Sequence, residues 1–213
     1  MSRSDALAPI VQSAPVVPVV IVDDAASAVP LARALVAGGL PVVEITLRTD
    51  AALDAIAAVA AEVDGAIVGA GTVLSADQWQ AAEKAGARYM VSPGASPNLL
   101  AAARDSAVPL MPGAATASEA MRLLEEGYTI QKFFPAEPAG GTAFLKALAS
   151  PLPTVRFCPT GGIGAANAGN YLALPNVICV GGSWVAPSEA IAAGDWARIE
   201  ALARDATGLR SAA

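Results

Sequence analysis

The chain has 213 residues, of which 54% are hydrophobic and only 15% are charged. This composition indicates one sizeable hydrophobic core and is not typical of a disordered protein. The formal net charge of −6 and the lack of any basic run argue against sequence-independent binding of nucleic acids.

The amino-terminal region begins with apolar stretches. We expect residues 1–14 to form an extension with one short helix that covers an end of the main domain. Pro15, Pro18 and the Asp23-Asp24 pair interrupt the apolar character early, which is not typical of a signal peptide. No stretch approaches the ~20 apolar residues needed to span a bilayer. The expectation is a soluble, cytoplasmic protein that does not bind membranes.

From residue 16 onward, short β-branched runs alternate with alanine-rich helical segments. The runs predicted as strands are 16–22, 42–47, 66–70, 88–91, 108–111, 129–134, 155–158 and 177–180. Helices are predicted between them, among others over residues 25–37, 51–63, 75–85, 118–126 and 188–206. This alternation favours a (β/α)8 TIM barrel over an open doubly wound sheet. We therefore predict an α/β fold with a single barrel domain over residues 15–213.

The alternation of side chains along a strand predicts which residues face the inside of the barrel. Glu44 and Arg48 fall on one face of the second predicted strand, opposite to Val43 and Ile45. In the sixth strand the same parity places Lys132 on the inner face. The lumen would thus hold an amine, a carboxylate and a guanidinium. Arg48 would lie nearest to the carboxyl-terminal mouth, where barrel enzymes carry out their chemistry.

Lys132 lies inside the apolar run 130–135, whereas Lys84 and Lys146 lie in helical stretches where a solvated position is the default. A primary ammonium costs free energy to desolvate, so a lysine in such a run needs a charged partner or is kept partly neutral. A neutral amine is a nucleophile toward carbonyls. The alternative is a structural ion pair with Glu44. A buried ion pair often stabilises a fold no more than an apolar pair does. We therefore favour a functional role for both residues.

Histidine is absent from the chain, which removes the commonest metal ligand and the commonest general base. Proton transfer near neutral pH then falls to a carboxylate, a lysine or a tuned hydroxyl. Cys158 and Cys179 lie in apolar, strand-like runs without CxxC spacing. We expect both to be reduced core residues and not a redox pair.

Two glycine-rich turns follow the last two predicted strands, Thr160-Gly161-Gly162-Ile163 and Gly181-Gly182-Ser183-Trp184. Glycine lets backbone N–H groups approach a phosphate closely, and barrels recurrently bind phosphate after strands seven and eight. Plain tight turns would suit one glycine pair, so two pairs favour a phosphate site. The segment Gly69-Ala70-Gly71-Thr72 is a weaker signal, because Thr72 could simply cap a helix. Its hydroxyl could also reach a ligand beside Arg48.

Six motifs occur in the order found in a known enzyme family. They are Glu44-Ile45-Thr46-Leu47-Arg48-Thr49, Gly69-Ala70-Gly71-Thr72-Val73-Leu74, Ser92-Pro93-Gly94, Lys132-Phe133-Phe134-Pro135-Ala136-Glu137, Cys158-Pro159-Thr160-Gly161-Gly162-Ile163 and Gly181-Gly182-Ser183-Trp184. On these motifs the chain resembles the 2-keto-3-deoxy-6-phosphogluconate (KDPG) aldolases of the Entner–Doudoroff pathway, which also act as 4-hydroxy-2-oxoglutarate aldolases. The resemblance runs from about residue 10 to about residue 208.

The resemblance implies a class I aldolase without metal or cofactor, on a (β/α)8 barrel that assembles as a homotrimer. Its implied substrate is a phosphorylated 2-keto acid, cleaved to pyruvate and glyceraldehyde 3-phosphate, and 4-hydroxy-2-oxoglutarate would give pyruvate and glyoxylate. By motif, Lys132 is the Schiff-base lysine and Glu44 is the acid/base. Arg48 and Thr72 are the implied ligands of the keto acid carboxylate.

The resemblance also implies how the rest of the substrate is held. Pro93 and Phe134 would wall the pocket, and Thr160 would line it near the part of the substrate that becomes the aldehyde. The implied phosphate contacts come from the two glycine turns and are Gly161, Gly162, Gly182 and Ser183.

Two other functions stay compatible with the residues. In a phosphosugar isomerase or epimerase, Glu44 would shuttle a proton while Lys132 polarised a carbonyl, and reductive trapping with pyruvate would then add no mass. In a non-catalytic barrel, assembly would be the purpose, and a folded chain would release no pyruvate. The residues do not determine which substrate is preferred among KDPG, its galactonate epimer and 4-hydroxy-2-oxoglutarate.

Overall fold

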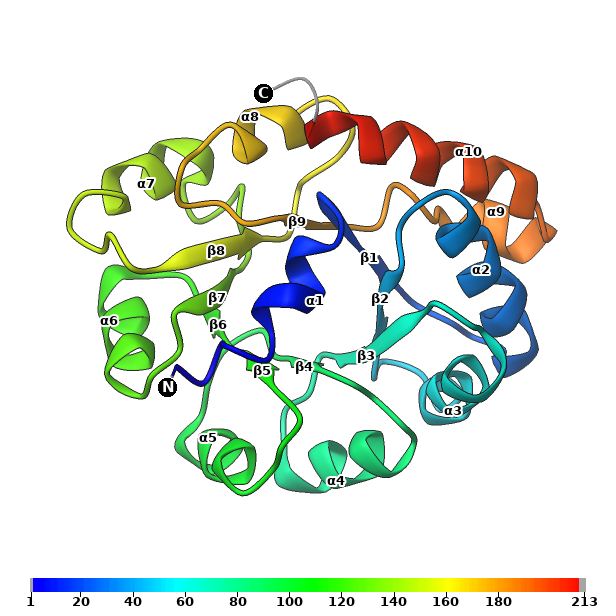
Figure 1. The fold of residues 1–213 in the computed structure, drawn as a ribbon, viewed down its shortest axis with the longest axis horizontal. Helices are drawn as coiled ribbons and strands as arrows, with labels where there is room; N and C mark the ends of the chain where they lie inside the picture. The colour runs from blue at the N-terminus through cyan, green and yellow to red at the C-terminus, as the bar shows by residue number, and fades with distance from the viewer. Residues whose placement is uncertain (1, 211–213) are drawn as a thin grey trace.

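The computed structural model describes residues 2–210. Its strands are β1 (Val16–Val20), β2 (Val42–Thr46), β3 (Ile67–Gly71), β4 (Met90–Val91), β5 (Leu110–Met111), β6 (Gly113–Ala114), β7 (Ile130–Phe133), β8 (Arg156–Pro159) and β9 (Val180–Gly182). Its helices are α1 (Ala8–Gln12), α2 (Ala25–Ala37), α3 (Ala52–Glu62), α4 (Ala76–Lys84), α5 (Pro97–Arg104), α6 (Ala117–Glu125), α7 (Gly141–Leu148), α8 (Ala168–Leu172), α9 (Ser188–Ala193), α10 (Trp196–Thr207) and the 3-10 turn η1 (Gly208–Arg210). The strands surround a common centre and the helices from α2 to α10 lie outside them (Figure 1).

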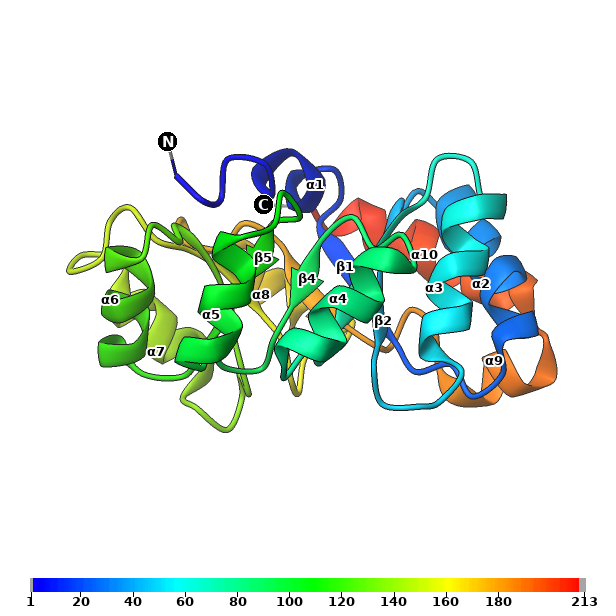
Figure 2. The ribbon, with the colours of Figure 1, turned by 90° about the horizontal axis from the view of Figure 1, so that it is seen from below.

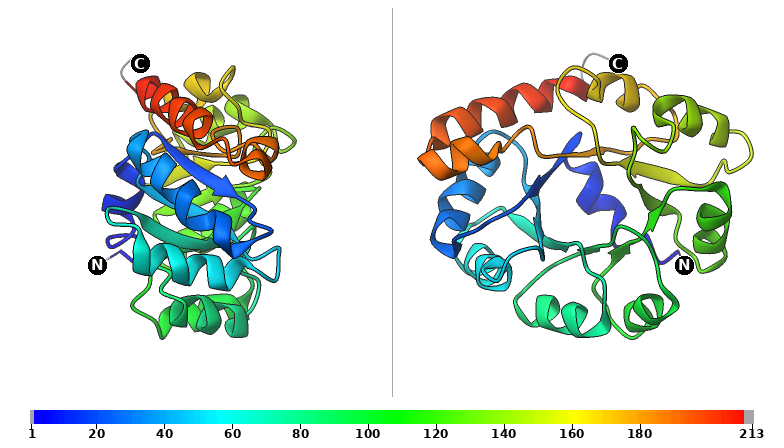
Figure 3. Two further views of the ribbon diagram at one scale, coloured as in Figure 1. Left: turned by 90° about the vertical axis from the view of Figure 1, so that its right-hand side faces the viewer. Right: turned by 180° about the vertical axis from the view of Figure 1, so that it is seen from behind.

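The strands pair in parallel, in one sheet ordered β5-β4-β3-β2-β1-β9 and a second ordered β6-β7-β8. Two isolated parallel bridges, Phe157 with Val177 and Thr160 with Gly181, connect β8 with the segment of β9. The last helix, α10, packs against α2 near the start of the chain (Figure 3). These contacts confirm the predicted α/β fold with parallel strands.

Strand side chains divide into two buried sets, as the alternation predicts. One set faces the helices and includes Val43, Ile45, Val68, Ala70, Phe133 and Phe157. The other fills the centre of the ring and includes Val17, Val42, Tyr89, Val91, Met111, Ile130, Cys158 and Cys179. Cys158 and Cys179 are both buried, which confirms them as core residues.

Helix α1 covers one end of the ring (Figure 2). Its residues Ile10 and Val11, together with the preceding Leu7, belong to the buried set that fills the centre. Ser4 anchors the segment, because its Oγ accepts hydrogen bonds from the N–H groups of Thr129 and Ile130, both at 3.0 Å. The predicted domain limits at residues 1 and 213 lie outside the described residues. Within residues 2–210, no helix is long and apolar enough to cross a membrane.

Each predicted strand has a counterpart, but the structure also has β6, which lies beyond the end of the fifth predicted strand (108–111) and is separated from β5 by Pro112. Met90 N donates to Pro109 O at 2.9 Å on one side, and Lys132 N donates to Pro112 O at 2.8 Å on the other. Since proline has no N–H for the ladder, the chain changes its partner here from β4 to β7. The last predicted strand also differs, because β9 begins at Val180 and Val177 forms only an isolated bridge.

The single helix predicted over residues 188–206 is wrong, because the structure has two helices there, α9 and α10. Gly194 adopts a left-handed φ of +65° and ends α9. The side chain of Asp195 accepts a hydrogen bond from Arg198 N at 3.1 Å and caps α10. The Gly-Asp pair therefore stops one helix and starts the next.

Candidate active site

Lys132 and Glu44 form a buried ion pair in the centre of the ring. Lys132 Nζ lies 3.3 Å from Glu44 Oε1, and the two side chains are 5% and 1% exposed. The Nζ atom also lies 5.3 Å from the centroid of the Phe134 ring. Lys132 lies on β7 and Glu44 lies on β2, and these two strands are not neighbours in either sheet. A lysine in such an apolar run is expected to have a charged partner or to be partly neutral, and the structure shows a charged partner, Glu44.

Small residues lie beside this pair on the adjacent strands. In register, Lys132 lies between Gly113 on β6 and Cys158 on β8, and Glu44 lies opposite Gly69 on β3. Because one side chain in two faces the centre of the ring, these neighbours point the same way as the pair. A β carbon at Gly69 would lie 2.3 Å from Tyr89 Cε1, and one at Gly113 would lie 2.2 Å from Pro93 O, so these two glycines make room for Tyr89 and for the turn at Pro93 beside the pair.

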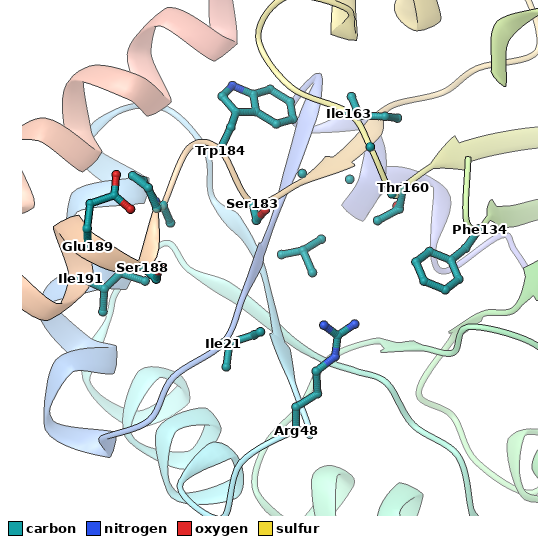
Figure 4. A pocket seen from close by; sticks show the side chains of 17 residues that line it. Ile21, Arg48, Phe134, Thr160, Ile163, Ser183, Trp184, Ser188, Glu189 and Ile191 are labelled. Carbon is teal, nitrogen blue, oxygen red and sulfur yellow. The ribbon is translucent and has the colours of Figure 1, made fainter. Parts of the chain in front are cut away.

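Arg48 and Thr72 are also brought together. Arg48 Nε donates a hydrogen bond to Thr72 Oγ1 at 3.1 Å. Thr72 has a φ of +58°, a left-handed conformation that β-branched residues rarely adopt. Such strain persists only where the surrounding structure enforces it, and it clusters at functional sites. In Figure 4 the guanidinium of Arg48 points into the adjacent pocket.

A pocket of about 460 Å³ lies at the end of the strands (Figure 4). Among its lining residues are Arg48, Phe134, Thr160, Gly161, Gly162, Gly182 and Ser183, all predicted from the sequence. Lys132 and Glu44 do not line it. They lie deeper in the ring, on strands β7 and β2, whereas the pocket residues Phe134 and Arg48 come after the ends of these two strands.

Pro93 is likewise absent from the pocket wall and lies against Gly113 on β6, the strand next to Lys132. A β carbon at Gly113, the residue opposite Lys132 in register, would lie 2.2 Å from Pro93 O. The turn at Pro93 therefore packs directly on β6. Thr72 lines no part of the pocket itself and reaches it through Arg48.

The turn after β8 has an unusual backbone, with φ values of +101° at Gly161 and +80° at Gly162. The preceding Thr160 is 7% exposed, and its Oγ1 has no hydrogen-bond partner among residues 2–210. A β carbon at Gly181 would lie 2.2 Å from this oxygen, so glycine leaves the hydroxyl its space. An unsatisfied buried hydroxyl costs about 1–3 kcal/mol, which a ligand that bonds to it would recover.

The charges around the pocket are few. Arg48 is the cation and Glu189 the anion of its lining residues, and Glu189 Oε1 is paired with Arg198 Nη2 at 3.0 Å. An anionic group at the glycine turns would therefore be bound by backbone N–H groups. Among residues 2–210, no group of three or more His, Cys, Asp or Glu could hold a metal ion.

Sequence reasoning missed two parts of this site. The first is the apolar wall of the pocket, made by Val19, Ile21, Ile163 and Trp184. Ile163 and Trp184 lie inside the motifs quoted above, and Ile21 directly follows β1. Their positions in the sequence could therefore have indicated that they line the pocket. The second is a polar cluster behind the glycine turn, formed by Glu137, Asn167 and Tyr171.

The family model for KDPG and KHG aldolase matches residues 7–202 of the chain. The KHG/KDPG aldolase of Escherichia coli K12 is 53% identical over 197 residues, which cover 92% of this chain and 92% of that protein. The 2-dehydro-3-deoxy-phosphogluconate aldolase of Pseudoalteromonas atlantica is 54% identical over 192 residues, covering 90% of this chain and 89% of the relative.

Two solved structures are similar over nearly their whole length. One is the KDPG aldolase of Legionella pneumophila with pyruvate captured as a covalent carbinolamine intermediate, at a TM-score of 0.91 and 45% identity, covering 93% of this chain and 96% of the other. The second is the 2-keto-3-deoxy-6-phosphogluconate aldolase of Zymomonas mobilis ZM4 with 3-phosphoglycerate, at a TM-score of 0.91 and 47% identity, covering 98% and 97%.

Proposed function

Because the chain belongs to the KDPG and KHG aldolase family, we propose that it cleaves 2-dehydro-3-deoxy-6-phosphogluconate to pyruvate and glyceraldehyde 3-phosphate. It also cleaves 4-hydroxy-2-oxoglutarate to pyruvate and glyoxylate. The observation that carries this proposal is the buried pair of Lys132 and Glu44 at 3.3 Å, directly below a pocket that Arg48 lines. An amine and a carboxylate in contact are what a metal-free aldol cleavage needs.

Lys132 is the nucleophile in this proposal. Transfer of one proton from Nζ to Glu44 across their hydrogen bond leaves a neutral amine beside a carboxylic acid. The amine adds to the C2 ketone of the substrate, and the former carbonyl oxygen takes up a proton to give a carbinolamine. Glu44 gives the proton it had taken up to the hydroxyl of that adduct, water leaves, and the products are a protonated imine and the carboxylate of Glu44. The carbinolamine captured with pyruvate in the Legionella relative supports this step.

Glu44 then transfers the protons of the cleavage. As a carboxylate, directly or through a water, it takes the proton of the C4 hydroxyl. The C3–C4 bond breaks, its electrons pass into the imine to form an enamine, and glyceraldehyde 3-phosphate leaves. Glu44 returns the proton to C3, and hydrolysis of the resulting imine frees pyruvate and Lys132.

Arg48 holds the carboxylate of the 2-keto acid, together with Thr72. Its Nε is engaged with Thr72 Oγ1, so the Nη groups are the ones that face the ligand. A guanidinium presents paired donors that match the two oxygens of a carboxylate. Phe134 and Pro93 restrict the space around the imine, since the Phe134 ring lies beside Nζ and Pro93 packs on β6.

The phosphate binds at the other side of the pocket, at the two glycine turns. Gly161, Gly162, Gly182 and Ser183 line it there and offer backbone N–H groups and a hydroxyl. The hydroxyl of Thr160 contacts the part of the substrate that becomes the aldehyde. The 3-phosphoglycerate in the Zymomonas relative supports a site for a phosphorylated three-carbon acid in this family.

We further infer that the ring of strands is a complete (β/α)8 barrel, formed by a single domain over residues 15–213 with the extension 1–14 at its amino-terminal end. The bridge between Thr160 and Gly181 and the continuity of β5 with β6 support closure. The family suggests a cytoplasmic homotrimer in the Entner–Doudoroff pathway. Light scattering should then give about three times the chain mass of 21.2 kDa.

Release of pyruvate from 2-dehydro-3-deoxy-6-phosphogluconate, coupled to lactate dehydrogenase, tests the proposal. Lys132→Ala should abolish turnover, whereas Lys84→Ala and Lys146→Ala should not, because both of these lysines are exposed on helices. A Lys132→Ala enzyme that keeps its turnover would contradict the assigned nucleophile. A folded wild-type chain that releases no pyruvate would contradict the function.

A further inference from the structure

Glu137 lies behind the glycine turn of the pocket and is bonded to the segment that follows that turn. Its Oε1 accepts hydrogen bonds from the hydroxyl of Tyr171 and from Asn167 Nδ2, the latter at 3.3 Å. Asn167 in turn donates from Nδ2 to Gly162 O at 3.0 Å and accepts from Gly164 N at 2.8 Å through Oδ1. The three side chains thus link the turn after β7 to the turn after β8.

The backbone of residues 136 and 137 is also hydrogen-bonded to this turn. Glu137 N donates to Gly161 O at 3.1 Å, and Ala136 N donates to Thr160 O at 2.8 Å. Together with the bond from Asn167 to Gly162 O, three successive carbonyls are directed away from the pocket. A β carbon at Gly162 would lie 2.7 Å from Glu137 Cγ, so the side chain packs directly on the turn.

The direction of these carbonyls decides where the N–H groups point. In a planar trans peptide unit the C=O and the N–H point in opposite directions. The carbonyls of residues 160, 161 and 162 point toward Ala136 N, Glu137 N and Asn167 Nδ2, so the N–H groups of Gly161, Gly162 and Ile163 point the other way. These three residues line the pocket. Within residues 2–210, the N–H groups of Gly162 and Ile163 donate to no protein acceptor.

The carboxylate of Glu137 is negative and close to a proposed anion site, so its charge has to be offset. The hydroxyl of Tyr171 and the amide of Asn167 supply two donors to one of its oxygens. Burial, with the Glu137 carboxylate, raises the pKa of Tyr171 well above its ordinary value, so the hydroxyl stays a donor at neutral and mildly alkaline pH. The cluster therefore keeps the same donors and acceptors at neutral pH.

We propose that Glu137, through Asn167 and Tyr171, is a positioning residue that holds the Gly161-Gly162 turn with its N–H groups facing the phosphate of the substrate. The inference rests on the proposed function and extends it to a residue outside the pocket. The proposed role depends on the acceptor oxygen of the side chain. Glu137→Gln should therefore keep the function of the turn, and Glu137→Ala should lose it.

The test compares Glu137→Ala, Glu137→Gln and Asn167→Ala with Glu125→Ala, a control on the exposed face of α6. For Glu137→Ala and Asn167→Ala, KM for the phosphorylated substrate should rise about tenfold, the effect of one lost hydrogen bond on a charged ligand. The kcat should change much less. Glu137→Gln and the control should stay within about twofold of wild type, a change too small to report a lost hydrogen bond.

Pyruvate supplies the readout that a merely structural role would move, because it has no phosphate. Borohydride trapping of pyruvate should proceed at wild-type rate in all four variants. Unchanged KM in both Glu137→Ala and Asn167→Ala would overturn the inference, and so would a loss of pyruvate trapping parallel to the rise in KM. A wild-type enzyme that traps no pyruvate would instead contradict the proposed function itself.

Discussion

The carboxylate of Glu44 occupies the space that a side chain at position 71 would need. A β carbon at Gly71 would lie 2.2 Å from Glu44 Oε1 and 2.8 Å from its Cδ. Contacts this short do not occur between real atoms, so any larger residue at position 71 must displace the carboxylate. The same Oε1 accepts the hydrogen bond of Lys132. Gly71 is therefore required for the geometry of the ion pair.

We predict that Gly71→Ala reduces kcat by about 100-fold, because it displaces Glu44, the proposed proton-transfer group, and a displacement of about 1 Å is enough for a loss of this size. Overpacking should also lower the free energy of unfolding by about 1–3 kcal/mol. Gly208→Ala is the control, because a β carbon there has open space within 4 Å. Turnover and urea unfolding measure the two effects. Wild-type kcat in Gly71→Ala would refute the requirement for the observed position of Glu44.

The buried ion pair predicts a non-additive response to removal of its two partners. Lys132→Met leaves Glu44 buried without its partner, and Glu44→Gln leaves Lys132 in the same position, which should cost about 3–5 kcal/mol each. Replacing both removes both unpaired charges, so the double variant should be more stable than the sum of the single effects by ~1–3 kcal/mol. Urea unfolding of the four proteins measures the coupling. Simple additivity would mean that the two side chains do not interact.

Stability should fall at alkaline pH because of the tyrosines. Burial raises the pKa of Tyr89 well above its ordinary value, with Glu44 adding to the effect, and burial also raises the pKa of Tyr128 and Tyr171. Above about pH 10, the unfolded chain loses these protons while the folded chain keeps them. The stabilisation is therefore complete below that pH and is lost as the pH rises toward the folded-state values.

Tyr89→Phe should make this alkaline loss less steep, because it removes one of the three titrating groups. Urea midpoints measured between about pH 8 and pH 11 give the slope for both proteins. Equal slopes for wild type and Tyr89→Phe would show that Tyr89 titrates normally in the folded state, against its burial.

Leu7 should contribute to stability although it lies near the amino terminus. Its side chain is fully buried among the residues that fill the centre of the ring. Leu7→Ala should therefore lower the free energy of unfolding by about 2–5 kcal/mol. Leu74→Ala is the matched control, since Leu74 is 57% exposed. Similar small effects for both leucines would mean that α1 does not seal the end of the ring in solution.

Local rules predicted the inner faces of the strands correctly, because the period of two along a strand depends on the strand alone. Glu44, Arg48 and Lys132 were placed together on that basis, although the chain separates Glu44 from Lys132 by 88 residues. The glycine turns were equally local signals. The long helix predicted over residues 188–206 failed because its alanine-rich pattern continues across Gly194-Asp195, where the left-handed Gly194 ends α9 and Asp195 caps α10.

Other features depend on contacts between distant segments. The pairing change at Pro112 requires knowing that β4 and β7 flank it. The left-handed φ of Thr72 is imposed by its surroundings and has no sequence signal. The cluster of Glu137 and Asn167 forms only because the turns after β7 and β8 meet in space. Such features follow from tertiary structure and not from periodicity.

Reductive trapping tests the central claim that Lys132 forms an imine with the substrate. The protein is incubated with pyruvate and borohydride, digested, and mapped by mass spectrometry. We predict one irreversible pyruvate adduct per chain, on the peptide that contains Lys132, and none on Lys84 or Lys146. An unchanged intact mass, which an isomerase would show, or an adduct on another lysine would contradict the account.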